Sequence, residues 1–264
     1  MSKQFIPAQR RERILDYLNL HKIVRSSELS NLLNVSEATV RRDLAWMENE
    51  GILNRTHGGA VLSEGFQFEP EYTLRAKRQV QEKRDIGRLA ADMINDGDIV
   101  FVNSGTTTSQ LIHNIRPNAD ITIVTNNLSA ALEINESSFE LILVGGVLQP
   151  KLNSVAGMFA VDNLNQIYAD QAFIGVDGIS INQGYTVPSL AEAEIVRMMF
   201  EQTKGPVTVL ADITKWESVS NFVVADIDKV NRIITDDELG PIAREALADF
   251  QVEVIYLATN LNLP

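Results

Sequence analysis

The stretch VSEATVRRDL, residues 35–44, determines how the first part of this chain folds. Ser36 is a favourable helix cap, and Val40, Leu44 and Met47 recur at helical spacing after it. This spacing predicts a helix that buries one apolar side, ends before a glycine and carries two adjacent arginines on its polar side. A helix of this kind that follows a tight turn has the geometry of one that enters the major groove of DNA.

Two more helices and a hairpin are predicted around this helix. Apolar residues recur at helical spacing in residues 8–20 and again in residues 26–33. Residues 52–62 are rich in β-forming residues and contain the pair Gly58-Gly59, which suits a hairpin turn. Three helices joined by tight turns and followed by such a hairpin predict a winged helix-turn-helix domain.

The polar positions of the third helix and of the hairpin are the candidates for contact with double-stranded DNA. They are Ser36, Glu37, Thr39, Arg41, Arg42, Arg55, His57, Gly58 and Gly59. The alternative is an ordinary three-helix bundle with a solvated polar face. The hairpin favours DNA binding, because Arg55 and His57 flank a glycine turn small enough to approach a phosphate or a minor groove.

Charge is distributed unevenly along the chain. The whole sequence carries a net charge of −12, which by itself argues against a nucleic-acid partner. Residues 1–62, however, contain nine Lys and Arg against seven Asp and Glu, a net charge of +2 that leaves −14 for the remainder. DNA binding requires only a local positive face, so a slightly basic head on an acidic body remains compatible with it.

The composition excludes several other classes of protein. The 264 residues include no cysteine, which excludes disulfides and cysteine nucleophiles, and no two of the three histidines have metal-ligand spacing. No run of about 18 apolar residues is present, and the polar amino terminus lacks the apolar core of a signal peptide. We therefore expect a cytoplasmic protein with no membrane partner, no metal site and no cofactor.

The length allows two domains. Residues 63–80 are polar and lack a sustained apolar period, which predicts a linker between a DNA-binding domain at 1–62 and a larger domain at 81–264. The larger domain contains seven apolar, β-type runs, mostly separated by helical patterns, which predicts an α/β fold with a largely parallel sheet covered on both faces. The runs are 99–102, 121–124, 141–144, 172–176, 207–210, 230–234 and 252–257.

The stretch NSGTTT, residues 103–108, follows the first of these runs and opens a predicted helix. Backbone amides and hydroxyl groups at the positive end of a helix suit a phosphate, although a plain polar turn would read the same way. Further polar stretches lie near other predicted strand ends, at 125–127, 145–146, 175–180 and 211–216. Each could be structural alone, but ligands of α/β sheets collect at the carboxyl ends of strands, so these segments could form one pocket.

Taken together, these motifs resemble the DeoR-type family of bacterial transcriptional regulators. VSEATVRRDL and EGILNRTHGGAV resemble the family's winged helix-turn-helix, and the ordered motifs from residue 96 to residue 216 resemble its sensor domain. The resemblance implies a fold similar to ribose-5-phosphate isomerase, the glucosamine-phosphate deaminases and the CoA-transferases. It also implies a regulator of carbohydrate use, most often a repressor, controlled by a phosphorylated sugar.

The resemblance implies a set of effector-binding residues as well. Ser104, Gly105, Thr106 and Thr107 would lie at the phosphate, and Asn126, Gly145, Asp177 and Lys215 would lie near the sugar. The alternative function is a sugar-phosphate isomerase or deaminase with an appended DNA-binding domain. It is disfavoured because Asp177 is followed by Gly-Ile-Ser, without the further acidic residues that the isomerases carry there, so we expect no enzymatic activity.

A single helix-turn-helix reads too few base pairs for useful specificity. We therefore expect at least a homodimer, assembled through the larger domain.

Overall fold

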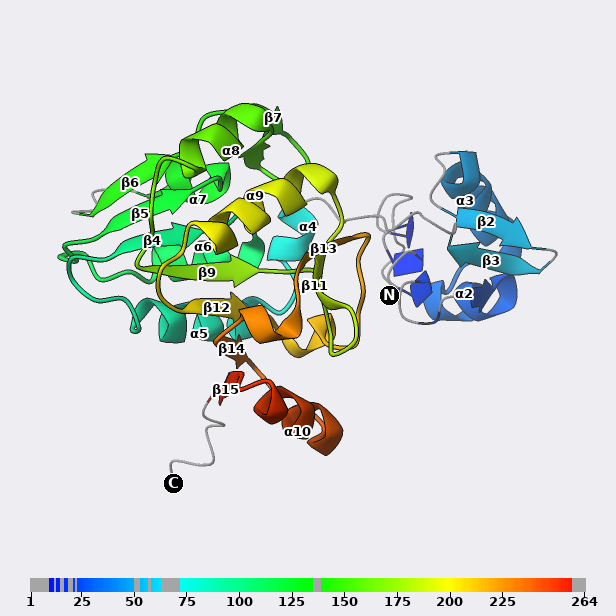
Figure 1. The fold of residues 1–264 in the computed structure, drawn as a ribbon. Helices are drawn as coiled ribbons and strands as arrows, with labels where there is room; N and C mark the ends of the chain where they lie inside the picture. The colour runs from blue at the N-terminus through cyan, green and yellow to red at the C-terminus, as the bar shows by residue number, and fades with distance from the viewer. Residues whose placement is uncertain are drawn as a thin grey trace, which may run out of the picture. The chain divides into compact units, whose positions relative to one another are not determined.

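The computed structural model describes residues 10–257 with several gaps, and these residues form two compact units, Met1–Glu69 and Pro70–Pro264 (Figure 1). The gaps are residues 12, 15–16, 19–20, 22, 50–52, 57, 63–71 and 135–138. Most of the predicted linker thus lies outside the described residues. Its end belongs to the second unit, because residues 72–80 include α4 (Tyr72–Ala76) and the first residue of α5 (Val80–Ala91).

The first unit is a winged helix-turn-helix, as predicted. Described residues between Arg10 and His21 are helical, followed by β1 (Ile23–Arg25), α2 (Ser26–Leu33) and α3 (Glu37–Asn49). The hairpin consists of β2 (Leu53–Thr56) and β3 (Gly59–Leu62). The three strands form one antiparallel sheet in the order β1-β3-β2. Strand β1 is the element that the sequence patterns did not predict.

One small core holds this unit together. Its buried side chains come from every described element: Ile14, Leu18, Val24, Leu29, Leu33, Val40, Leu44, Met47, Leu53 and Ala60. The apolar side predicted for α3 therefore faces this core, and the polar side faces away from it.

The second unit is built on a seven-stranded parallel sheet in the order β15-β14-β12-β9-β4-β5-β6. Each of the predicted apolar runs overlaps one of its strands, so the parallel α/β prediction is confirmed. The strands are β4 (Ile99–Val102), β5 (Thr122–Thr125), β6 (Glu140–Leu143), β9 (Gln171–Gly175), β12 (Val207–Leu210), β14 (Arg232–Thr235) and β15 (Glu253–Tyr256).

Helices cover both faces of this sheet (Figure 1). One face packs against α5 (Val80–Ala91), α6 (Thr106–His113) and α7 (Leu128–Glu133). The other packs against α8 (Met158–Leu164), α9 (Leu190–Glu201) and α10 (Pro241–Asp249). Successive residues of one strand point to opposite faces, which is why each strand is apolar on both sides and reads as a continuous hydrophobic run.

Two small antiparallel sheets and two single-turn helices complete the unit. One sheet joins β10 (Gly178–Ser180), β11 (Gly184–Val187) and β13 (Phe222–Ala225), and the other joins β7 (Val147–Gln149) and β8 (Ser154–Ala156). The short 3-10 helices are η1 (Ile213–Lys215) and η2 (Ile227–Lys229).

The strand order reverses between β4 and β9. From β4 the chain builds β5 and β6 on one side, then returns to place β9, β12, β14 and β15 on the other side. The chain segments that leave β4 and β9 at the carboxyl ends of these strands therefore lead to helices on opposite faces of the sheet. In open α/β sheets, ligands bind at this switch point.

Candidate functional site

The polar side of α3 is open to contact. Ser36, Glu37, Arg41 and Arg42 are exposed, and Thr39 is half-buried. The Ser36 hydroxyl accepts a hydrogen bond from the amide N–H of Thr39, with 3.2 Å between oxygen and nitrogen, and so caps the start of the helix. The first turn is thereby fixed while its polar groups remain at the surface.

The two arginines of this helix are held only by weak contacts. The Arg41 Nη2 lies 3.0 Å from the Glu37 carboxylate, and both side chains are largely exposed. The Arg42 Nε donates to the backbone carbonyl of Ala38 at 3.3 Å. Exposed ion pairs of this kind contribute about 0.5 kcal/mol, so both guanidinium groups can exchange these partners for DNA phosphates or bases.

The neighbouring Asp43 serves the fold. Its carboxylate is buried and accepts hydrogen bonds from Arg10 Nε at 2.8 Å and Arg11 Nε at 3.2 Å. The Arg11 guanidinium also lies 3.9 Å from the centre of the Trp46 ring. These two arginines therefore tie the first helix to α3.

In the hairpin, the Arg55 amide and guanidinium donate to the Glu48 carboxylate at 3.0 and 2.8 Å. These hydrogen bonds lower the pKa of Glu48. Gly58 is exposed and has open space around its α-carbon, whereas His57 lies outside the described residues. Gly59 is required by packing, because a β-carbon there would lie 1.8 Å from the carbonyl oxygen of Val24.

The loop after β4 is fixed by side-chain amides from neighbouring strand ends. The Asn103 side chain exchanges hydrogen bonds with the backbone of Gly175, at 2.7 and 2.9 Å. The Ser104 amide donates to the buried Asn126 side chain at 2.7 Å. The ends of β4, β5 and β9 are thus held together at the switch point.

Helix α6 starts directly after this loop. Its first amide groups, including those of Thr106 and Thr107, lack partners one turn earlier in the helix. The side chains of Ser104 and Thr107 are buried, and Gly105 and Thr106 are half-exposed. Four predicted phosphate-site residues therefore lie at a positive helix end, at the carboxyl end of β4.

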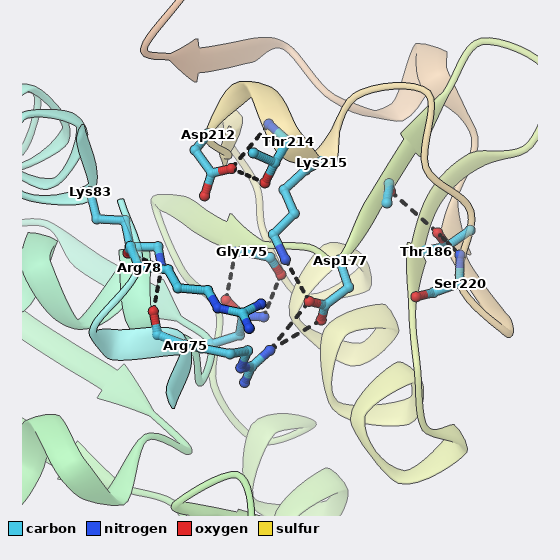
Figure 2. A network of polar contacts seen from close by, with 12 residues as sticks. Arg75, Arg78, Lys83, Gly175, Asp177, Thr186, Asp212, Thr214, Lys215 and Ser220 are labelled. Atoms are coloured by element: carbon cyan, nitrogen blue, oxygen red, sulfur yellow. Dashed lines mark hydrogen bonds and ion pairs between the residues drawn. The ribbon is translucent and has the colours of Figure 1, made fainter. Parts of the chain in front are cut away.

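Asp177, which follows β9, is the centre of a charged cluster at the same end of the sheet (Figure 2). Its carboxylate lies 2.8 Å from Lys215 Nζ and 3.3 Å from Arg75 Nη1. Burial would raise the pKa of Asp177, but the two cations outweigh it and hold this pKa at about 2. The same attraction overcomes burial to raise the pKa of Lys215. The carboxylate is therefore a permanent hydrogen-bond acceptor.

Lys83, on α5, completes the cluster. Its Nζ donates to the backbone carbonyls of Arg75 and Arg78 at 2.7 and 2.8 Å. Burial lowers the pKa of Lys83 to about 8, against the attraction of Asp212. Figure 2 shows Arg75, Arg78 and Lys83 reaching the cluster from the α4–α5 side.

Comparisons with known proteins agree with this division of the chain. Residues 10–65 match the family model described as the DeoR-like helix-turn-helix domain, and residues 78–237 match the DeoR C-terminal sensor domain. The chain belongs to the DeoR family of transcriptional regulators.

Similar proteins of the DeoR family carry names of regulators. The transcriptional repressor GlcR of Bacillus subtilis is 34% identical over 84% of this chain and 86% of its own length. A putative aga operon transcriptional repressor of Escherichia coli O157:H7 is 31% identical over 94% of this chain and 93% of its own. These names do not support the alternative of an enzyme with an appended DNA-binding domain.

Among solved structures, a ribose 5-phosphate isomerase from Methanocaldococcus jannaschii is 13% identical to this DeoR-family chain. It covers 51% of this chain and 53% of its own, with a TM-score of 0.37. This likeness concerns part of the fold alone.

Two of the predicted effector residues of this DeoR-family chain make hydrogen bonds within the fold. Gly145 follows the edge strand β6, which β5 separates from β4, and its amide donates to Asn163 on α8. The Asn126 side chain is already used, since it accepts from Ser104 and donates to the Val155 carbonyl. The Asn126 side chain therefore holds the loop after β4 in its conformation.

Sequence reasoning missed three cations of the cluster, Arg75, Arg78 and Lys83. They lie in or shortly after the segment predicted to be a linker, because its polar composition hid α4 and the start of α5. The basic residues in the stretch LRAKR stand next to an acidic domain, and this could have indicated that they contact its carboxylates.

Two features are absent from the described residues of this DeoR-family chain. Within them, no group of three His, Asp or Glu is placed to hold a metal ion. No helix in the same part of the chain is long and apolar enough to cross a membrane.

Proposed function

We propose that this chain represses a carbohydrate-utilisation operon and is controlled by a phosphorylated sugar bound at the carboxyl ends of β4, β9 and β12. The observation that carries the proposal is the convergence at the switch point of a helix N-terminal loop, Ser104–Thr107, with the charged cluster around Asp177. The loop offers amides and hydroxyls to a phosphate. The cluster offers the ionised Asp177 as a hydrogen-bond acceptor, and cations as donors, to the hydroxyl groups of a sugar.

The geometry supports one assignment of roles within this site. The phosphate would lie at Ser104, Gly105, Thr106 and Thr107, where the α6 dipole is positive. Asp177 would accept hydroxyl groups of the sugar, and Lys215 would contact its oxygens. Asn126 positions Ser104, and Gly145 would act only indirectly, through the path of the chain beyond β6.

A thermal melting screen tests this function. The chain is heated with a panel of pentose and hexose phosphates, with the matching unphosphorylated sugars and with inorganic phosphate. We expect at least one sugar phosphate to raise the melting temperature and to release operator DNA, with no turnover of the ligand. If no sugar phosphate in the panel binds, or if the bound one is converted to product, the proposal is wrong.

Arg41 and Arg42 are proposed to bind operator DNA. Replacing either with alanine is expected to weaken binding by about 1–3 kcal/mol if a base contact is lost, or to reduce the salt slope by about one unit if a phosphate contact is lost. The melting temperature should stay the same, since both side chains are exposed. Fluorescence anisotropy at several salt concentrations measures both effects. Arg84→Ala, at an exposed position on α5, is the control, and unchanged binding in both test variants would exclude these contacts.

We also propose a homo-oligomer formed through the second unit. Exposed apolar side chains lie on the edge strand β6, on β7 and at the start of α8: Ile142, Leu143, Val147, Leu148, Met158 and Phe159. We call this set the β6-edge patch. A second copy of the chain is its occupant, because a helix-turn-helix needs a symmetric partner to read two half-sites.

Phe159→Glu is expected to yield monomers and to weaken operator binding strongly. Phe159 is 73% exposed within the patch, so a charge there costs little in the free chain but would be buried in the oligomer. Ile242→Glu is the matched control, since Ile242 is 83% exposed on α10, outside the patch. Sedimentation velocity measures the mass of each variant. A parent chain that is monomeric at micromolar concentration would rule out the oligomer.

A further inference from the structure

The segment Tyr72–Arg78 is held to the second unit by contacts with α6, with Lys151 and with Asp177 of the candidate effector site. The Tyr72 hydroxyl lies 2.7 Å from the Ser109 hydroxyl on α6, and the Tyr72 amide donates to the Lys151 carbonyl at 2.9 Å. Arg75 contacts Asp177, a residue 102 positions further along the chain. We call residues 72–78 the anchor segment.

The cluster around the anchor segment brings several buried or half-buried charges together. Arg75, Arg78, Lys83 and Lys215 lie near the carboxylates of Asp177 and Asp212, and Asp236 lies near Asp212. The side chains of Arg75 and Asp177 are only 13% and 16% exposed, so water screens their charges poorly. An anionic group that reaches Arg75 would therefore interact with it strongly.

The contact of Arg75 with Asp177 is the weaker of the two that this carboxylate makes. Arg75 Nη1 lies 3.3 and 3.5 Å from the carboxylate oxygens, whereas Lys215 Nζ lies at 2.8 Å. Well-formed charged hydrogen bonds measure about 2.7–2.9 Å, and arginine favours a phosphate that it can bind with two parallel hydrogen bonds. If Arg75 leaves, Lys215 still neutralises Asp177.

We propose that Arg75 binds the anionic group of the effector in exchange for Asp177, so that the anchor segment shifts when the site is filled. This inference rests on the proposed function. Residues 63–71 connect the anchor segment covalently to the DNA-binding unit, so the shift is passed along the chain itself. Arg75 is thus both a ligand for the effector and the first residue in the path of its signal.

Arg75→Gln tests this inference, with Lys77→Gln as the matched control because Lys77 is an exposed cation of the same segment. The probes are inorganic phosphate and the sugar phosphate that stabilises the parent chain most. We expect Arg75→Gln to bind the sugar phosphate about tenfold to hundredfold more weakly by calorimetry, as the loss of a charged hydrogen bond predicts. Lys77→Gln should bind like the parent.

Hydrogen exchange supplies a second measurement. At saturating sugar phosphate, amides of the anchor segment should change their exchange rates in the parent and in Lys77→Gln but not in Arg75→Gln. Arg75→Lys, which keeps the charge but cannot bind with two parallel bonds, should weaken binding less than Arg75→Gln and guards against a folding defect.

The outcomes separate this inference from the function on which it rests. Parent affinity and parent exchange changes in Arg75→Gln would overturn the role of Arg75 alone, while the effector site would stand. A parent chain that binds neither probe would overturn both.

Discussion

Replacing Thr106 with aspartate is expected to abolish the response to the effector. The new carboxylate would lie at the start of α6, where the structure leaves the first amides without helical partners, and would occupy the proposed phosphate position. Two unit charges about 4 Å apart repel by about 4 kcal/mol at an effective dielectric constant of 20, a loss of roughly 10³-fold in affinity. The ligand should therefore no longer bind at any practical concentration.

Calorimetric titration and operator release measure this effect. Thr106→Asn is the matched control, because it has nearly the same shape as aspartate without its charge, and it should retain most of the affinity. An acidic residue in the first turn stabilises a helix, so unfolding would not explain the loss. Operator binding without effector should persist. If Thr106→Asp binds the sugar phosphate as tightly as the parent, the loop is a structural turn and the phosphate site lies elsewhere.

Replacing Gly59 with alanine is expected to unfold the first unit under conditions in which the second remains folded. The added β-carbon would lie 1.8 Å from the Val24 carbonyl oxygen and 2.9 Å from the Arg25 α-carbon. Both are backbone atoms of β1, so no side chain can move aside, and the pairing of β1 with β3 must open. We expect a loss of about 4 kcal/mol, above the usual range for overpacking.

Gly58→Ala is the control for this prediction. Nothing lies within 4 Å of the position that its β-carbon would take, so the stability should hardly change. Denaturant unfolding, followed by the fluorescence of Trp46 in the first unit, measures both variants. A stable Gly59→Ala chain that has lost only operator binding would show that this glycine serves the DNA contact.

Local patterns in the sequence were sufficient to predict most of the secondary structure. Apolar residues at helical spacing placed α2 and α3, and continuous apolar runs placed all the strands of the parallel sheet. Both patterns reflect burial on one face or on two, which a short window of sequence records. The motif from Asn103 to Thr108 likewise showed a strand-to-helix turn, which the structure contains between β4 and α6.

The members of the candidate site could be predicted only in part. Ser104, Asp177 and Lys215 lie in stretches that follow predicted strands, and strand ends of a parallel sheet share one edge, but their role at an effector was implied by the resemblance to the DeoR family. Arg75 and Lys83 were missed because nothing local distinguishes a cation that reaches a buried carboxylate from one in solvent. The packing role of Gly59 was missed for a similar reason, because its close contact is with β1, a strand that no sequence pattern predicted.

The sequence by itself determined the helices α2 and α3 and the strands of the parallel sheet, and that one polar helix side carries two arginines. Only the tertiary structure decided which strands are neighbours, and therefore that β9 lies beside β4 and brings Asp177 to the loop at Ser104. It also decided that Arg75 meets Asp177 across 102 positions of chain. The physical reason is that periodicity records whether a residue is buried, whereas the partner of a buried charge depends on the sum of all packing contacts in the unit.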